Sequence, residues 1–202
     1  MSNNLEWKLK DVIVMAIVSM VFAVVYLLAV YLGVFFSTLL SPLGLAPLAN
    51  EPIYGIWFMA STFIAYVLRK PGAAFISEVL AALMEVLLGN MYGPLVLISG
   101  AIQGLGAELV FLITRYKNFS LSVMCLAGVS AGVFSFVWGY FRGGFTLIAT
   151  WLLATMLLVR LVSSAFFAGY LSRRLALSFV KSGLLKSFGT RKLSLKKSDQ
   201  DV

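Results

Sequence analysis

Histidine is absent from this chain of 202 residues, and cysteine occurs once. The lack of histidine excludes Ser-His and Cys-His nucleophile pairs, and it excludes zinc or haem held by histidine. A single cysteine, Cys125, makes neither an internal disulfide nor a thiolate metal site, and its apolar surroundings favour a packed hydrophobic side chain. We therefore expect no enzyme activity, no metal ion and no cofactor.

Charged residues are also scarce. They form 12% of the chain against 61% hydrophobic residues, and the mean hydropathy is +0.97, whereas about a quarter of a soluble domain is charged. This composition predicts an integral protein of the lipid bilayer with one compact domain, 1–172, and a basic tail, 173–202. The net charge of +8 is not expected to bind nucleic acid, because the basic residues fall in connectors and the tail.

Long apolar runs predict an all-α bundle of six membrane helices. Each run approaches the roughly 17–20 residues that a helix needs to cross the bilayer. The first run is too long for a signal-peptide core and lacks a convincing cleavage site after it, so we expect a retained helix. The predicted spans are 12–36, 53–68, 72–88, 95–114, 121–140 and 145–171.

Lysine and arginine alternate from one side of the predicted spans to the other. Of the 16 basic residues, 14 precede the first span, join the second to the third or the fourth to the fifth, or follow the sixth. The exceptions are Arg142, in an opposite connector, and Arg160, inside the sixth span. The positive-inside rule predicts both termini in the cytoplasm. The tail is expected either to lie on the anionic inner leaflet or to remain solvated.

Ionisable residues inside a membrane span are costly and are usually functional or paired. A helix rise of about 1.5 Å per residue places Glu78, Glu108 and Arg160 at similar depths, nearer the inner surface. We expect Arg160 to form a structural ion pair with Glu78, Glu108 or both, since a buried charge needs a partner.

A second polar group is predicted nearer the outer surface. Glu85 follows Glu78 by seven residues on the same helix face, and it has no evident cationic partner other than Arg142. Carboxylates, amides and aromatic rings at this level suit a small, flat, partly cationic heteroaromatic ligand, although an interfacial aromatic belt explains each ring taken singly. The candidate binding residues are Glu51, Tyr54, Trp57, Glu85, Asn90, Tyr92, Gln103, Trp138 and Tyr140.

Small residues recur at four-residue spacing, which lets helix backbones approach closely in lipid. Packing within the bundle explains such pairs. For the first span, docking of an outside protein is the alternative. The pairs are Ser19 and Ala23, Gly100 and Gly104, and Gly128 and Gly132.

The sequence resembles the YkoE family in four segments: VIVMAIVSMVFAVVYLL (12–28), EPIYGIWF (51–58), RKPGAAFISEVLAALMEVLLGN (69–90) and GAIQGLGAELVFL (100–112). The resemblance covers roughly residues 8–170. YkoE-like proteins are substrate-binding S components of energy-coupling-factor (ECF) vitamin transporters, and the family is linked to thiamine and its hydroxymethylpyrimidine precursor.

The resemblance implies a six-helix S-component fold that binds the vitamin with high affinity near the outer surface. It also implies a membrane coupling protein (the T component) and two ABC-type ATPases as partners, which would drive delivery of the vitamin into the cell. In many S components, a small-residue motif on the first helix contacts the coupling protein; the best match here is Ala16, Ser19 and Ala23. The choice between thiamine and hydroxymethylpyrimidine remains open.

Two other functions compete with this one. A stand-alone secondary transporter of a small cationic heteroaromatic would use Glu78 and Glu108 as proton- or sodium-coupling carboxylates, but no inverted repeat is visible to support it. An intramembrane enzyme is disfavoured because the spans lack histidine and paired aspartates.

Overall fold

The computed structural model describes residues 6–182, and within this range the chain consists of helices joined by turns and short connectors, with no strand. The predicted all-α fold is confirmed. The 3-10 helix η3 runs directly into α2, and the π-helix η5 joins α6 to α7. The α-helices are α1 (Leu9–Leu40), α2 (Met59–Leu68), α3 (Ala73–Leu87), α4 (Leu95–Ile113), α5 (Leu121–Arg142), α6 (Thr150–Ser164) and α7 (Ser172–Lys181). The other helical segments are η1 (Ser41–Leu43), η2 (Ala46–Leu48), η3 (Glu51–Phe58), η4 (Phe145–Leu147) and η5 (Ala165–Leu171).

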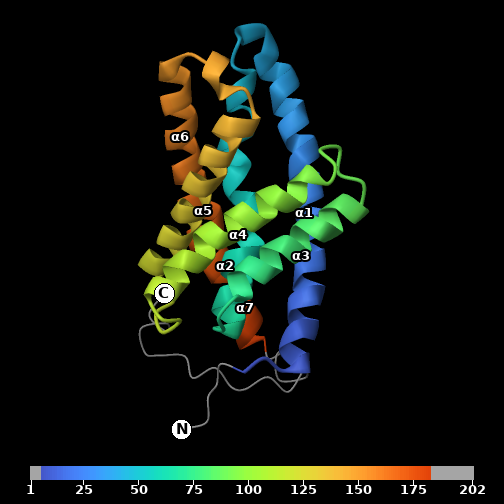
Figure 1. The fold of residues 1–202 in the computed structure, drawn as a ribbon, viewed down its shortest axis with the longest axis vertical. Helices are drawn as coiled ribbons and strands as arrows, with labels where there is room; N and C mark the ends of the chain where they lie inside the picture. Colours follow the sequence, from blue (N-terminus) through green and yellow to red (C-terminus); the bar gives the residue numbers. More distant parts are fainter. Residues whose placement is uncertain (1–5, 183–202) are drawn as a thin grey trace.

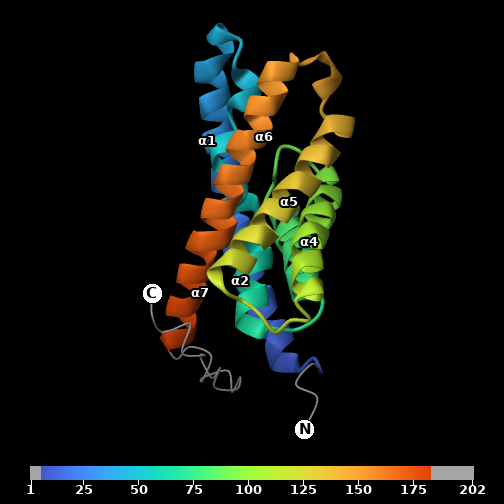
Figure 2. The same ribbon diagram turned by 90° about the vertical axis from the view of Figure 1, so that its left-hand side faces the viewer.

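Helices of two orientations build the bundle. α1 and the α6–η5–α7 segment follow the long axis, whereas α3 and α4 cross it obliquely (Figure 1). α4 packs against α3 on one side and against α5 on the other. The hairpin of α3 and α4 ends below the upper ends of α1 and α6 (Figures 1 and 2).

Five described segments are long and apolar enough to cross a membrane. The remaining helix, α3, has 15 residues and measures about 22 Å at 1.5 Å per residue, which is short of a hydrocarbon core about 30 Å thick. The six predicted spans all appear as helices, but α3 is too short to cross alone. The five segments are Leu9–Leu43, Ala46–Leu68, Leu95–Ile113, Leu121–Arg142 and Thr150–Lys181.

The sixth predicted span, 145–171, has different bounds in the structure. Its helix begins at Thr150, after an extended residue at Ile148, and continues through η5 and α7 to Lys181. The hydroxyls of Thr62 and Ser172 are 2.9 Å apart and hydrogen-bonded, so α7 belongs to the bundle. The domain boundary placed after residue 172 thus falls inside a continuous helical segment. The rest of the predicted basic tail, 183–202, lies outside the described residues.

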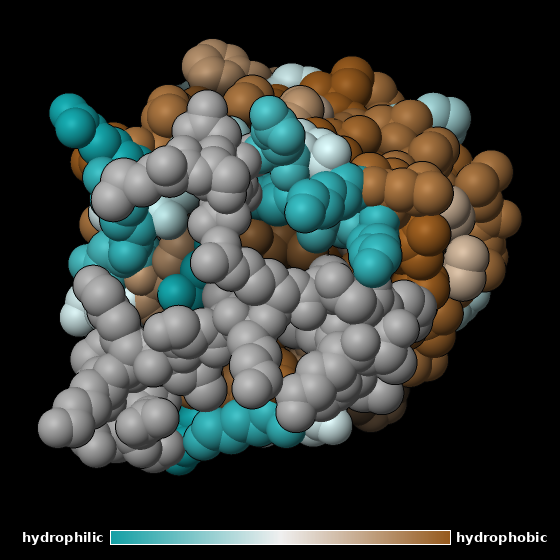
Figure 3. All heavy atoms as spheres, turned by 90° about the horizontal axis from the view of Figure 1, so that it is seen from below, coloured by the Kyte–Doolittle hydropathy of each residue, from teal (hydrophilic) through white to brown (hydrophobic). Residues whose placement is uncertain are grey.

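The described basic connectors gather at one end of the molecule, together with the start of α1 and α7 (Figures 1 and 2). A view of that end shows hydrophilic side chains there and hydrophobic side chains on the flank beside them (Figure 3). Lys70, in the α2–α3 connector, forms an ion pair with Asp11 of α1. The two ends of the described chain therefore lie on the same side, as the alternation of charge predicts.

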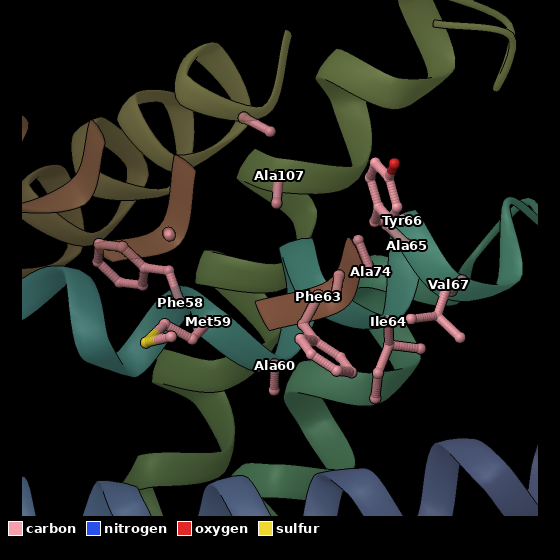
Figure 4. Packing of buried hydrophobic residues seen from close by; sticks show 14 of the residues in the cluster. Phe58, Met59, Ala60, Phe63, Ile64, Ala65, Tyr66, Val67, Ala74 and Ala107 are labelled. Atoms are coloured by element: carbon pink, nitrogen blue, oxygen red, sulfur yellow. The ribbon is translucent and has the colours of Figure 1, made fainter. Parts of the chain in front are cut away.

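The core is centred on α2. Residues Met59–Val67 of this helix are all buried, and side chains from α3 and α4 surround them (Figure 4). Small residues at the contacts, such as Ala60, Ala74 and Ala107, are fully buried and allow the helices to approach closely. In lipid, where the hydrophobic effect does not drive helices together, such close packing stabilises the bundle.

The small-residue pairs serve this internal packing. A Cβ at Gly128 would lie 2.5 Å from the carbonyl oxygen of Ser164, so α5 must be free of a side chain there. Ser19 and Ala23 are fully buried, and the Ser19 hydroxyl donates to the carbonyl oxygen of Ser77 at 3.1 Å. Both residues face α3 or the core, so internal packing accounts for them in this structure, and a docking role for Ser19 and Ala23 stays a prediction. Ala16 is half-buried.

Candidate functional site

A cavity of about 570 Å³ lies toward the end of the molecule opposite the basic connectors, within the usual size range of small-ligand sites. Its walls come from α1, η2, η3, α3, α4, α5, η4 and α6. Eight of the nine predicted binding residues line it: Glu51, Tyr54, Trp57, Glu85, Asn90, Tyr92, Gln103 and Trp138.

Tyr140 is the exception. It lies on α5 but not in the cavity wall, and its side chain is 40% exposed. Residues two apart on a helix point about 200° apart, so Tyr140 faces away when Trp138 faces the cavity. The structure therefore does not bring Tyr140 together with the other eight predicted binding residues.

Glu51 and Arg160 form a bidentate ion pair that is almost completely buried. Arg160 Nε donates to Glu51 Oε2 at 2.6 Å and Nη2 donates to Oε1 at 2.6 Å. A third bond runs from Nη1 to the hydroxyl of Ser135 at 3.3 Å. The predicted pairing of Arg160 with Glu78 or Glu108 is wrong, because η3 brings Glu51 against α6. Glu51 is consequently neutralised rather than open to a ligand.

The packing of η3 on α6 explains this ion pair. A Cβ at Gly55 would lie 2.3 Å from the carbonyl oxygen of Ser163, so only glycine permits the contact. The backbone N–H of Gly55 donates to the Ser163 hydroxyl at 3.0 Å. Glu51 and Arg160 precede these residues by about one turn and therefore meet across the same interface.

Glu108 has a structural role of another kind. Its carboxylate accepts hydrogen bonds from the backbone N–H groups of Gly72, Ala74 and Phe75 at 2.6, 2.9 and 3.2 Å. Gly72 is the N-cap residue of α3, and Ala74 and Phe75 lie in its first turn. The N–H groups at a helix N-terminus have no partner within the helix. Tyr116 also donates to Glu108, and burial, followed by this carboxylate, raises the pKa of Tyr116. Glu108 does not line the cavity.

Glu78 lies at the inner part of the cavity wall and is 1% exposed. Its Oε2 accepts hydrogen bonds from the backbone N–H of Ser61 at 2.9 Å and from the Tyr26 hydroxyl at 3.2 Å. The Tyr26 oxygen in turn accepts from the N–H of Ala60 at 2.9 Å. These bonds satisfy the free N–H groups at the start of α2. The sequence did not predict Glu78 as part of the site, although its seven-residue spacing from Glu85 placed both on one face.

Glu85 lies in the same wall, close to the connector between α3 and α4. The Asn90 side chain donates to Glu85 Oε1 at 2.6 Å, and its own oxygen accepts from the N–H of Tyr92 at 2.7 Å. Gly89 and Gly93 adopt positive φ angles of 93° and 65°, which turn the connector back over the helix end. The Tyr92 hydroxyl is protonated at neutral pH and can donate a hydrogen bond, and burial raises its pKa further.

Aromatic rings enclose these carboxylates. The Arg160 guanidinium carbon lies 3.6 Å from the centre of the Tyr54 ring, so one face of Tyr54 is already occupied by a cation. The Tyr54 and Trp57 rings are 5.4 Å apart. Trp138 is fixed by a hydrogen bond from Nε1 to the Ser99 hydroxyl at 3.0 Å. Trp57, which packs against Tyr54, and Trp138, which is hydrogen-bonded to Ser99, thus supply aromatic ring surfaces in the cavity wall.

The cavity wall holds three carboxylates and two guanidinium groups. Glu51 is neutralised by Arg160, whereas neither Glu78 nor Glu85 forms an ion pair within residues 6–182. In that same range, no group of three or more His, Cys, Asp or Glu side chains could hold a metal ion. The arrangement is suited to a ligand that carries hydrogen-bond donors or positive charge together with a flat ring.

Comparison with known proteins gives consistent results. The family model described as "ABC-type cobalt transport system, permease component" matches residues 10–134. The chain is 46% identical over 192 residues to the "Putative HMP/thiamine permease protein YkoE" of Bacillus subtilis (strain 168), covering 95% of this chain and 94% of the relative. A solved structure described as "Crystal structure of an S-component of ECF transporter" matches with a TM-score of 0.85 and 46% identity over 90% of each chain.

Proposed function

Because this chain belongs to the YkoE family of ECF transporter S components, we propose that it is the membrane subunit that binds thiamine or hydroxymethylpyrimidine for import. It is a multi-pass membrane protein, and its relatives are transport proteins rather than enzymes. The matching relative is named for both compounds.

The observation that carries this proposal is a cavity in which Glu78 and Glu85, which have no ion-pair partner among residues 6–182, lie among indole rings. Thiamine combines an aminopyrimidine with a cationic thiazolium, so it offers donors to the carboxylates and a charged ring to the indoles. The family description names cobalt, but the described residues form no cluster of metal ligands. An organic cation therefore suits the cavity better.

The proposal includes partners that bind and hydrolyse ATP. The connectors between the described helices are too short to hold a nucleotide-binding domain. We assign ATP hydrolysis to two ABC-type ATPases and their coupling to a membrane T component, as expected for an S component. Because Ser19 and Ala23 are fully buried, we assign no contact surface for the T component.

The proposal also fixes the orientation in the cell membrane. The described basic connectors share one end of the molecule with the start of α1 and with α7, and positively charged loops remain in the cytoplasm. We therefore propose that both termini are cytoplasmic and that the cavity lies toward the outer surface.

Calorimetry on the detergent-purified chain tests the binding function. We expect 1:1 binding of thiamine or hydroxymethylpyrimidine by the chain alone. Uptake into vesicles that contain the chain should then require the ATPase partners. Uptake without any ATPase, lost when a proton or sodium gradient is removed, would instead support a stand-alone secondary transporter.

A further inference from the structure

Two acidic residues of the cavity lie on the same face of α3 at different depths, and their placement suggests how a ligand is oriented. We propose that Glu78 recognises the amino group of the pyrimidine at the inner end of the cavity, while Glu85 faces the thiazolium nearer the mouth. This inference rests on the proposed function. It adds the direction in which the ligand lies in the cavity, here called the polarity of binding, and it adds a second carboxylate that recognises the ligand.

The depth of the two residues follows from their environments. Glu78 and Glu85 are both 1% exposed, so their neighbours distinguish them: Glu78 adjoins Tyr26 and the start of α2 in the core. Glu85 contacts Asn90 of the α3–α4 connector, at the end of the hairpin. Seven residues of helix separate the two carboxylates by about 10 Å along α3, so one small ligand would meet them at its opposite ends.

Glu78 is held in place with hydrogen-bonding capacity to spare. An ionised carboxylate has about four acceptor positions, and the N–H of Ser61 and the hydroxyl of Tyr26 both donate to Oε2. Capacity therefore remains for a donor that enters the cavity. Because the two protein donors lie on different helices, they also fix the orientation of the carboxylate before a ligand arrives.

The packing of α4 directs Glu78 toward the cavity. A Cβ at Gly104 would approach the Cβ of Glu78 to 3.0 Å, and a Cβ at Gly100 would approach that of Ala82 to 2.6 Å. The two glycines thus let α4 lie directly against α3 at the level of Glu78 and Ala82. With α4 so close, the carboxylate extends along the cavity wall toward Tyr26 and Ser61.

This polarity accounts for a site that takes both compounds. Thiamine and hydroxymethylpyrimidine share the aminopyrimidine, and only thiamine has the thiazolium. A deep carboxylate that accepts a hydrogen bond from the amino group would serve both ligands, whereas a carboxylate near the mouth would add affinity for thiamine alone. The hydroxyethyl end of thiamine would then point outward, toward the connectors that line the mouth.

The test compares ligands on the full-length chain in detergent by calorimetry. The probes are thiamine, hydroxymethylpyrimidine and oxythiamine, in which an oxo group replaces the pyrimidine amino group. We expect Glu78→Gln to weaken binding of thiamine and hydroxymethylpyrimidine by about ten- to a hundredfold, the range for a charged hydrogen bond. The preference for thiamine over oxythiamine should shrink by the same factor.

Three other variants serve as comparisons. Glu85→Gln should weaken thiamine binding and leave both hydroxymethylpyrimidine binding and the preference over oxythiamine unchanged. Tyr26→Phe removes the hydrogen bond that Tyr26 donates to Glu78 and the one that it accepts from the N–H of Ala60, but it keeps the carboxylate, so the preference should persist. Glu108→Gln changes a carboxylate outside the cavity and should leave all three affinities nearly unchanged.

The outcomes separate recognition from a purely structural role. Equal loss for all three ligands in Glu78→Gln would assign Glu78 only to the start of α2 and overturn the inference. Loss of the preference in Glu85→Gln instead would reverse the polarity and also overturn it. If Glu78→Gln does not fold, Glu78→Asp keeps the charge but shortens the reach, and an unchanged preference there would count against recognition. Failure of the unmodified chain to bind thiamine or hydroxymethylpyrimidine would overturn the proposed function together with this inference.

Discussion

Arg160 of α6 donates to both carboxylate oxygens of Glu51 at 2.6 Å and thereby joins the last long helix to η3. The same guanidinium lies 3.6 Å from the centre of the Tyr54 ring. One arginine thus neutralises an acid of the cavity wall and also holds an aromatic side chain of that wall in place.

Removal of one member of this ion pair should destabilise the protein strongly. Arg160→Met leaves Glu51 buried without its partner, and loss of one partner from a buried pair lowers the free energy of unfolding by about 3–5 kcal/mol. We expect the double variant Glu51→Gln/Arg160→Met to recover much of this loss. Thermal and denaturant unfolding of the detergent-purified chain would measure both. The single variant Glu51→Gln completes the comparison. If the loss of unfolding free energy in the double variant equals the sum of the losses in Arg160→Met and Glu51→Gln, the two residues do not act as a unit.

Glu108 is predicted to stabilise the start of α3 without touching the ligand. Glu108→Ala removes the acceptor of three backbone N–H groups and of the Tyr116 hydroxyl. Unsatisfied buried donors cost about 1–3 kcal/mol each at most, reduced here because the site is only half-buried. We expect a lower unfolding midpoint with nearly unchanged thiamine affinity. A large loss of affinity in a folded variant would show that Glu108 acts on the cavity.

The small residues of α1 are predicted to matter for the isolated subunit. Ala23 is fully buried, so Ala23→Leu overpacks the contact of α1 with the bundle and should destabilise it by about 1–3 kcal/mol. Val24 is 47% exposed, and Val24→Leu on the adjacent face is the matched control. The unfolding midpoint of each purified chain gives the comparison. Unaltered stability in Ala23→Leu, with association to the T component lost, would support the docking role.

Trp138 and Tyr140 should differ in their effect on binding, although they are two residues apart. Trp138 lines the cavity and is fixed by its bond to Ser99, whereas Tyr140 faces outward. We expect Trp138→Ala to weaken thiamine binding by roughly tenfold or more, since a stacked aromatic group contributes about 1–2 kcal/mol to a cation. Tyr140→Ala should leave the affinity unchanged. Comparable losses in the two variants would place Tyr140 in the site after all.

The sequence predicted the all-helical fold and the order of the helical segments, because these depend on apolar length and charge alternation. It misplaced Arg160, which was expected at the depth of Glu78 and Glu108 but pairs with Glu51 in the cavity wall. It could not predict helix rotation, which decides that Arg160 meets Glu51 and that Tyr140 faces away. Depth along the chain gives the height of a side chain but not its direction. Family resemblance supplied the substrate class, and it did not supply the placement of single residues.

The role of Glu78 was missed for a related reason. Its partners are the free N–H groups of Ala60 and Ser61 and the hydroxyl of Tyr26, and these groups are free only because a 3-10 helix changes to an α-helix at Met59. An apolar run from 53 to 68 reads as one continuous helix, with no signal for that change. The π-helix after α6 was likewise hidden in an unbroken apolar run.

Gly55 is predicted to be essential for the geometry of the site as well as for stability. In Gly55→Ala the new Cβ would lie 2.3 Å from the backbone oxygen of Ser163, and a backbone atom cannot move aside as a flexible side chain can. η3 would have to shift away from α6 and draw Glu51 from Arg160. We expect a loss of stability of about 1–3 kcal/mol, as for other overpacked contacts, together with weaker thiamine binding because Tyr54 and Trp57 move with η3.

Gly139→Ala provides the matched control for Gly55→Ala. Its Cβ would meet ring atoms of Phe145 at 3.3 Å and the Nη1 atom of Arg160 at 4.0 Å, an ordinary contact distance, and the Phe145 side chain can yield where a backbone atom cannot. We therefore expect a small change in the unfolding midpoint. Thermal unfolding compares the stability of the two variants, whereas calorimetry with thiamine compares Gly55→Ala with the unmodified chain, because Gly139 itself lines the cavity. If Gly55→Ala retains wild-type stability and affinity, the close approach of η3 to α6 is not what holds Glu51 against Arg160, and the ion pair must be positioned by the α6 side alone.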